Sequence, residues 1–272
     1  MRHVLSLGAG VQSSTVALMA AKGEITPMPE CAIFADTGWE PAAVYDWLSW
    51  LEEQLPYPVV RVMKGNIRED NVNARVRGKK TGESRWASLP FFVDTGEGNK
   101  GMITRQCTAE YKIEPIEKYM RRELLGLKPR QRAPAGFQFM QWRGISTDER
   151  IRARPTRVKW FDVRYPLIEH GMTRGHCLEW MHANGFPQPP RSACLGCPFH
   201  SDAEWLRIKT EDPVGWADVV EFDRVIRKAG GMRGDSFLHA SLKPIDEVEF
   251  VTSTSMGQTD MFINDCMGMC GV

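Results

Sequence analysis

Four cysteines lie at turns or helix starts, where a thiol could do chemistry. Cys194 and Cys197 form a C-x-x-C pair in SACLGCPFH, and this spacing is typical of a metal half-site or a redox pair. Cys107 follows the basic Arg105 at the start of a predicted helix, and Cys177 falls in the first turn of another. Helix N-termini favour the thiolate. Four such sulfurs would hold a [4Fe-4S] cluster or a tetrahedral zinc ion.

Other donors keep the cysteine assignment open. His200 extends the pair to C-x-x-C-x-x-H, which favours zinc, and buried thiols without a metal are the third alternative. Cys266 and Cys270 lie in the last seven residues, CMGMCGV. Chain ends are commonly mobile, so a cysteine there can reach a crevice as a nucleophile or sulfur carrier. The same two cysteines could instead complete the metal site or be incidental.

A second candidate site lies near the start of the chain, in SLGAGVQSST. Gly8 and Gly10 allow close backbone approach before a predicted helix, whose N-terminus attracts anions. Ser13, Ser14 and Thr15 add hydroxyl donors. The stretch has neither the third glycine of the dinucleotide motif nor the Gly-Lys of the Walker motif. It predicts a phosphate site, with a serine-capped tight turn as the alternative.

The next apolar segment also ends in polar residues, in FADTGWEP. Ligands of open parallel sheets bind outside the carboxyl ends of the strands, which is where Asp36 and Thr37 fall. Asp36 could orient a ribose, a metal ion or the neighbouring loop, or it could cap the helix expected after Pro41.

The elements needed to position these residues follow from periodicity. We expect strands over 2–9, 31–38 and 57–65, with helices over 13–22 and after Pro41. This alternation predicts an α/β fold with an open, mostly parallel twisted sheet and helices on both faces. We assign residues 1–186 to this domain, with 65–104 as a long loop or lid, and 187–272 to a cysteine-bearing segment packed on it.

Composition excludes several classes of protein. The net charge is +1, from 35 basic and 34 acidic residues, so no global field attracts nucleic acid or a membrane. No apolar run suits a membrane span and no signal peptide is evident, so we expect a cytoplasmic protein. The seven cysteines are an odd number without an export signal, which argues against a disulfide framework.

Taken together, these segments resemble a known family. GAGVQSS, ADTGWEP, CTAEYKIEP, WRGISTDERIR, YPLIEHGMTRGHCLEWM and CLGCP follow in order the layout of phosphoadenosine-phosphosulfate (PAPS) reductase-like proteins. These belong to the adenine nucleotide alpha-hydrolase, or PP-loop ATP pyrophosphatase, superfamily, and the closest likeness is to bacterial and phage-encoded members. The resemblance implies an adenine nucleotide-binding fold from about residue 4 to the C-terminus.

The resemblance also implies functional residues. The family's phosphate loop falls on Gly8, Ala9, Gly10, Gln12, Ser13 and Ser14, and its adenine-contacting strand end on Ala35, Asp36, Thr37 and Gly38. Arg143, Gly144 and Arg150 resemble the segment that meets the phosphate or sulfate end, and guanidinium groups suit those oxyanions. Cys270 resembles the family's catalytic cysteine. Gln12 replaces the loop aspartate, which puts magnesium-dependent ATP cleavage in doubt. The adjacent cysteine pair that holds a cluster in some members is missing at Cys107, and Cys177 is the substitute.

Two classes of function therefore stand. In the first, the protein is an enzyme that binds ATP or a sulfonucleotide and reduces or transfers sulfur, supplied by a sulfur donor or a thiol reductant protein. A homodimer and a nucleic-acid substrate are open alternatives, and the only support for the latter is the arginine-rich stretch 143–164. In the second, the protein is a non-catalytic nucleotide- or nucleic-acid-binding module with structural zinc.

Overall fold

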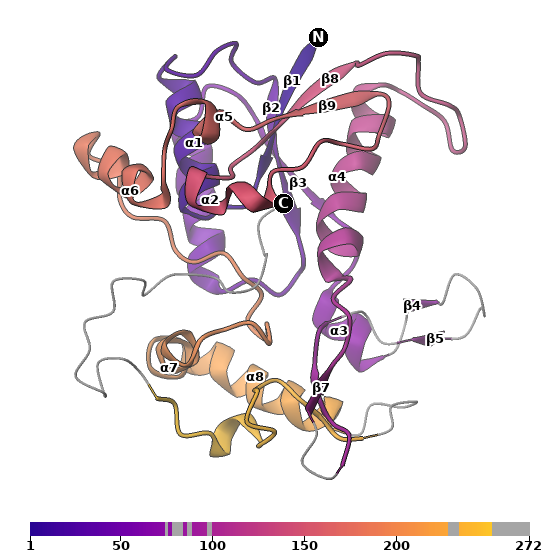
Figure 1. The fold of residues 1–272 in the computed structure, drawn as a ribbon, viewed down its shortest axis with the longest axis vertical. Helices are drawn as coiled ribbons and strands as arrows, with labels where there is room; N and C mark the ends of the chain where they lie inside the picture. The colour runs from indigo at the N-terminus through magenta and orange to yellow at the C-terminus, as the bar shows by residue number, and fades with distance from the viewer. Residues whose placement is uncertain (74–75, 78–83, 86–88, 97–99, 228–233, 252–272) are drawn as a thin grey trace.

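A five-stranded sheet forms the centre of the protein, in the order β3-β2-β1-β8-β9 with every pairing parallel (Figure 1). The computed structural model describes residues 1–73, 76–77, 84–85, 89–96, 100–227 and 234–251. The expected α/β class with an open parallel sheet is confirmed. The strands are β1 (Arg2–Leu7), β2 (Cys31–Asp36), β3 (Val59–Met63), β8 (Phe139–Arg143) and β9 (Phe161–Arg164).

Helices cover both faces of this sheet, as expected. Leu5 of β1 and Phe34 of β2 face a core shared with the first set of helices, whereas Val4 and Ile33 face the second set. Both faces of each central strand are buried, which is why these strands are apolar throughout. The first set is α1 (Val11–Ala21), α2 (Ala42–Gln54), α5 (Pro166–Glu169) and α6 (Arg174–Ala183); the second is α4 (Glu114–Tyr119), continued by the π-helical turns η1 (Ala109–Ile113) and η2 (Met120–Leu124).

The chain order creates a switch point at β1. From β1 the chain proceeds outward through β2 and β3, and then returns to place β8 on the other side of β1. Connections that leave neighbouring strands in opposite directions open a crevice at the strands' carboxyl ends. The loops after β1 and β8 therefore border the expected ligand position.

A second core lies below the sheet in Figure 1. Trp205, Phe222 and Phe91 are fully enclosed in it, and a small antiparallel sheet, β10-β6-β7, borders it. It joins residues 67–111 to residues 194–250, so the segment expected as a long loop contains ordered elements that pair with the C-terminal segment. The elements around this core are α3 (Ile67–Val72), β6 (Phe92–Asp94), β7 (Lys100–Met102), α7 (Asp202–Glu211), α8 (Pro213–Ile226), β10 (Ser236–Phe237) and the 3-10 turn η4 (Ile245–Glu247). Outside it, β4 (Val76–Arg77) and β5 (Ser84–Arg85) pair with each other, and the 3-10 turn η3 (Thr147–Arg152) follows β8. The boundary at 186/187 stays a prediction.

Among the described residues, no helix has both the length and the apolar character required to cross a membrane.

Candidate functional site

The loop between β1 and α1 presents uncapped helix amides. Ala9 takes a left-handed backbone conformation with φ of 56°, and Gly10 is the N-cap, with no side chain capping it. The Ser13 hydroxyl accepts from the Gly8 amide at 3.1 Å and contacts the Gly10 carbonyl at 3.3 Å, which closes the loop on itself. The helix begins at Val11, two residues earlier than expected, so its first-turn amides point out of this loop and form an anion cradle.

Two of the expected hydroxyl donors point away from that cradle. Ser14 is fully buried, and its hydroxyl accepts a hydrogen bond from the Trp47 indole at 2.9 Å. Thr15 is also buried and donates to the Val11 carbonyl at 2.9 Å. Their position in α1 turns them toward α2 and α6, so they support the loop from inside the core.

Gly144 allows the end of β8 to pack directly against the β1–α1 loop. A Cβ at this position would lie 2.7 Å from both the Cα and the backbone nitrogen of Ser13, and 3.0 Å from the carbonyl carbon of Gln12. A Cβ essentially never lies closer than 3.0 Å to atoms of a distant backbone segment, so glycine is required for this approach. Gln12 also joins the two segments, since its amide donates to Glu149 at 3.3 Å. The structure therefore brings Gly8–Ser13 and Gly144 together as expected.

Arg143 and Arg150, which we expected to contact the phosphate or sulfate group of a nucleotide, lie in different surroundings. Arg143 donates twice to Gln141 Oε1, at 3.1 and 2.9 Å, on the sheet face covered by α4. Burial lowers the pKa of the Arg143 guanidinium, while Tyr165 and Glu117 beside it act in the opposite direction. Arg150 lies exposed in the η3 turn.

A buried arginine beside the loop was not predicted from the sequence. All three guanidinium nitrogens of Arg191 are enclosed and lack a hydrogen-bond partner among the described residues, and so does the Ser192 hydroxyl. The nearest carboxylate, Glu204, is 3.8 Å from Arg191 and is bonded mainly to Arg207. A Cβ on Gly10 would lie 3.7 Å from the Cβ of Ser192. Unpaired buried donors are costly, so this cluster fits an anion held against the loop.

The loop after β2 is held by its own side chains. Asp36 Oδ1 accepts from the Gly38 amide at 2.7 Å and from the Tyr45 hydroxyl at 3.0 Å. Gly38 has φ of 71°, and its carbonyl accepts from Asn66 at 2.9 Å. Asp36 is therefore an organiser of this loop, which was one of its three expected functions, and the N-cap of α2 is Pro41.

A small hollow separates the ends of β1 and β2. Its volume is about 20 Å³, and Ser6, Gly8, Ala35 and Lys112 are among its lining residues. That volume suits one water molecule. The Lys112 ammonium lies 3.9 Å from the buried Glu40 carboxylate and restricts this opening. The structure thus places Ala35 at the crevice, where it lines this hollow.

Cys194 meets the loop after β2. Its sulfur lies 3.2 Å from the Thr37 hydroxyl and 3.7 Å from Glu40 Oε1. Burial and the Glu40 charge raise the pKa of this thiol well above its usual value. A Cβ on Gly196 would overlap the Trp39 ring at 2.0 Å, so the C-x-x-C turn is packed directly on this loop. Cys107 packs against the same core as Cys194.

The expected set of four sulfurs does not come together. Cys177 lies in the α1–α6 core with no exposed surface, and burial raises its pKa to about 12. Its place in the first helical turn therefore does not make it a thiolate, because burial outweighs the helix field. Among the described residues, no three His, Cys, Asp or Glu side chains form a group that could hold a metal. The residues placed here do not fit the predicted cluster.

The zinc alternative meets the same difficulty. His200 Nε2 lies 2.9 Å from the carbonyl oxygen of Cys194, and burial together with Arg191 lowers the pKa of the imidazole to about 4. Cys31 is a buried core residue, as expected. The expected catalytic residues Cys266 and Cys270 lie outside the described residues.

We expect Cys177→Ala to leave metal content unchanged, because the Cys177 thiol belongs to the core. Loss of its packing and of the contact with Thr15 should lower the free energy of unfolding by about 1 kcal/mol. Anaerobic purification with iron, sulfide and zinc assays checks the first point, and urea unfolding the second. Loss of bound iron in this variant alone, with the fold intact, would contradict the core assignment.

Comparison with solved structures finds distant structural likeness to known proteins. No family model matches the sequence, and no curated protein matches it. A solved structure of phosphoadenylyl-sulfate (PAPS) reductase from Candida auris, in a phosphate complex, is similar over 70% of this chain and 75% of that chain. The identity is 13% and the TM-score is 0.43, so the likeness is too distant to assign a function.

Proposed function

We propose that the protein binds an adenine nucleotide at the carboxyl edge of its parallel sheet, with the phosphates against the β1–α1 loop. The observation that carries this proposal is the set of unpaired donors there, namely the uncapped amides that follow Gly10 and the enclosed groups of Arg191 and Ser192. They converge at the switch point beside β1, where open α/β sheets bind ligands. Charge-assisted hydrogen bonds to oxyanions are the strong kind, so phosphate is the group they suit best.

The adenosine part of the proposal rests on the resemblance and on neighbouring structure. Ala35 lines the hollow next to Gly8, and the loop from Asp36 to Gly38 is rigid because Asn66 and Tyr45 hold it. Gln12 stands where the family has an aspartate, so the loop's own residues offer no carboxylate for a metal, and the Gln12 amide donates to Glu149 of the neighbouring segment. We therefore propose nucleotide binding without requiring ATP cleavage.

We further propose that the enzyme performs sulfur chemistry on the bound nucleotide, as a PAPS reductase-like oxidoreductase or a sulfurtransferase. Cys194 lies against Thr37, directly after β2, so one thiol borders the crevice. Cys270 or Cys266 would supply the nucleophile, and a thiol reductant or sulfur donor protein would renew it. The predicted [4Fe-4S] cluster has no fitting set of ligands among the described residues, and no step of the proposal depends on it.

Replacing the tail cysteines tests the enzymatic half of the proposal. We expect Cys270→Ser to abolish release of sulfite from a sulfonucleotide, or transfer of sulfur in the presence of ATP, while nucleotide affinity stays within about twofold, since the hydroxyl is a poor substitute for a thiolate nucleophile. Cys31→Ser is a matched control for thiol loss outside the site. Full turnover with both tail cysteines replaced would leave a nucleotide-binding module without this catalysis.

A further inference from the structure

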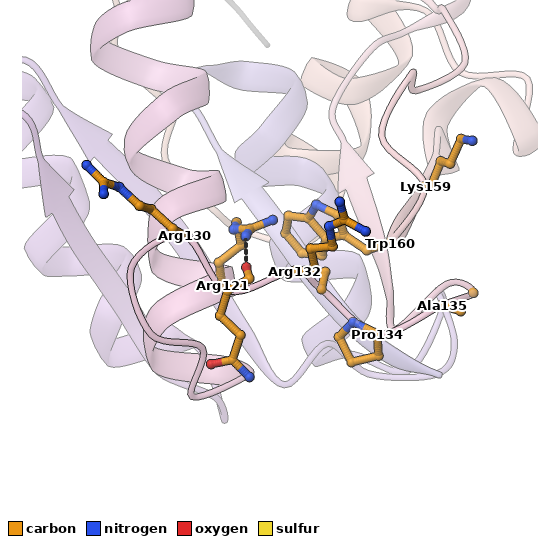
Figure 2. A pocket seen from close by; sticks show the side chains of 10 residues that line it. Arg121, Arg130, Arg132, Pro134, Ala135, Lys159 and Trp160 are labelled. Atoms are coloured by element: carbon orange, nitrogen blue, oxygen red, sulfur yellow. Dashed lines mark hydrogen bonds between the residues drawn. The ribbon is translucent and has the colours of Figure 1, made fainter.

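Figure 2 shows the side chains that line an open basic groove. The groove lies before β8 and β9, at the edge of the sheet opposite to the β1–α1 loop. Its volume is about 500 Å³. It adjoins the beginnings of β8 and β9, because the Gln138 amide donates to the Trp160 carbonyl at 2.8 Å just before both strands start. All strands are parallel, so this edge is about 15 Å from the carboxyl edge along a five-residue strand. The lining residues are Arg121, Arg130, Gln131, Arg132, Ala133, Pro134, Ala135, Gly136, Lys159 and Trp160.

Four cations and no carboxylate line this groove. Arg130, Arg132 and Lys159 are exposed and have no ion-pair or hydrogen-bond partner for their charged groups within the part of the chain that the structure describes. Arg121 is fixed, because it donates to the Gln131 carbonyl at 2.7 Å and stacks 5.7 Å from the centre of the Trp160 ring. One cation is thus positioned in advance, and three are free to meet a ligand's anionic groups.

The net charge of the whole chain does not show the excess of basic residues in the segments around this groove. Residues 118–137 and 153–160, which lead into β8 and β9, contain nine basic residues and one acidic residue, a net charge of +8, whereas the whole chain has +1. The remaining residues therefore carry −7. Such a separation of charge produces a strong local field even when the total is near zero.

A chain-like anion fits this surface better than a single phosphate. The groove is much larger than one phosphate group, and the exposed Arg154 and Arg157 extend the positive surface along the segment that leads to Lys159. Phe137 follows the lining residue Gly136, and 51% of its surface is exposed. The bases of a single strand can stack on exposed aromatic rings beside cations, whereas the bases of a duplex are already paired and stacked on one another.

We propose that this groove binds a single strand of nucleic acid, with Arg130, Arg132 and Lys159 on its phosphates and Phe137 stacked on a base. The inference does not depend on nucleotide binding at the other edge. Arg130 and Arg132 line the groove from the loop before β8, and Lys159 lines it from the segment before β9. A nucleic-acid strand bound there would therefore cross the amino edge of the sheet.

Fluorescence anisotropy with the full chain and a labelled single-stranded oligodeoxynucleotide tests the proposal. We expect the double variant Arg130→Gln/Arg132→Gln to bind at least about tenfold more weakly at roughly 50 mM salt, and the slope of log affinity against log salt to fall by about 1.4. Phe137→Ala should weaken binding by about fivefold or more. The matched control, Lys22→Gln/Lys243→Gln, removes two exposed cations outside the groove and should bind like the wild type.

Three outcomes would overturn the proposal. These are no binding by the wild-type chain, equal losses in the groove and control variants, or binding to anionic phospholipid vesicles without binding to the oligonucleotide. A parallel titration with ATP keeps the two sites apart, because the groove variants should bind ATP as the wild type does.

Discussion

Arg191→Met is expected to weaken ATP binding by about 10- to 100-fold while leaving the free energy of unfolding unchanged or higher. The affinity falls because charge-assisted hydrogen bonds to phosphate contribute about 1.5 to 3 kcal/mol. Stability does not fall, because the guanidinium nitrogens are enclosed without hydrogen-bond partners among the described residues, and Glu204 keeps its bonds to Arg207. Replacing a poorly paired buried charge by an apolar side chain is often neutral or stabilising.

Two variants separate this result from a general effect of losing an arginine. Arg191→Lys keeps the charge and should recover part of the affinity. Arg224→Met removes an exposed arginine paired with Asp246 and should change neither affinity nor stability appreciably. Calorimetric titration and urea unfolding of the same samples give both quantities. A large loss of stability in Arg191→Met, with unchanged affinity for ATP, would mean that Arg191 is structural.

Gly144→Ala is expected to reduce ATP affinity by about 100-fold or more and to lower stability by about 2 kcal/mol. The added methyl group meets backbone atoms of Ser13 and Gln12 at 2.7 to 3.0 Å, so the end of β8 must move away from the loop. This displacement disturbs the first turn of α1, whose amides form the cradle. The geometric requirement for anion binding is strict, so a small shift has a large effect on affinity.

Gly175→Ala provides the matched control for adding a methyl group. Gly175 lies near the start of α6, and a Cβ there approaches only the Thr173 hydroxyl, at an ordinary 3.5 Å. Alanine favours helix over glycine, so this variant should gain about 0.5 to 1 kcal/mol and bind ATP normally. If Gly144→Ala bound ATP as tightly as Gly175→Ala, the loop would not be the phosphate site.

Local pattern predicted most of the sheet domain. The strand at residues 2–7 and the helix after Pro41 could be predicted because the spacing of their apolar residues shows which faces are buried. The position of the glycine-rich loop between β1 and α1 could be predicted too, since its glycines follow an apolar run and precede a helical pattern. The direction of the Ser14 and Thr15 hydroxyls could not be predicted, because it depends on where α1 begins and what packs against it.

The contacts between distant segments could not be predicted. Cys177 looked like a thiolate from its helix position, but the packing of α6 on α1 buries it. Phe91 and Phe222 share a core although 131 residues separate them, and nothing local indicates that pairing. Arg191 had one sequence signal, its place beside Ser192 and the C-x-x-C turn, but the approach of Ser192 to Gly10 depends on the tertiary structure.

The most direct test of the account is a calorimetric titration of the wild-type chain with adenosine, AMP, ADP and ATP. If the β1–α1 loop, Arg191 and Ser192 bind phosphates, affinity should rise with each added phosphate and be lost for adenosine. Equal affinity for adenosine and ATP, or no binding of any of the four, would contradict a phosphate site at this edge of the sheet.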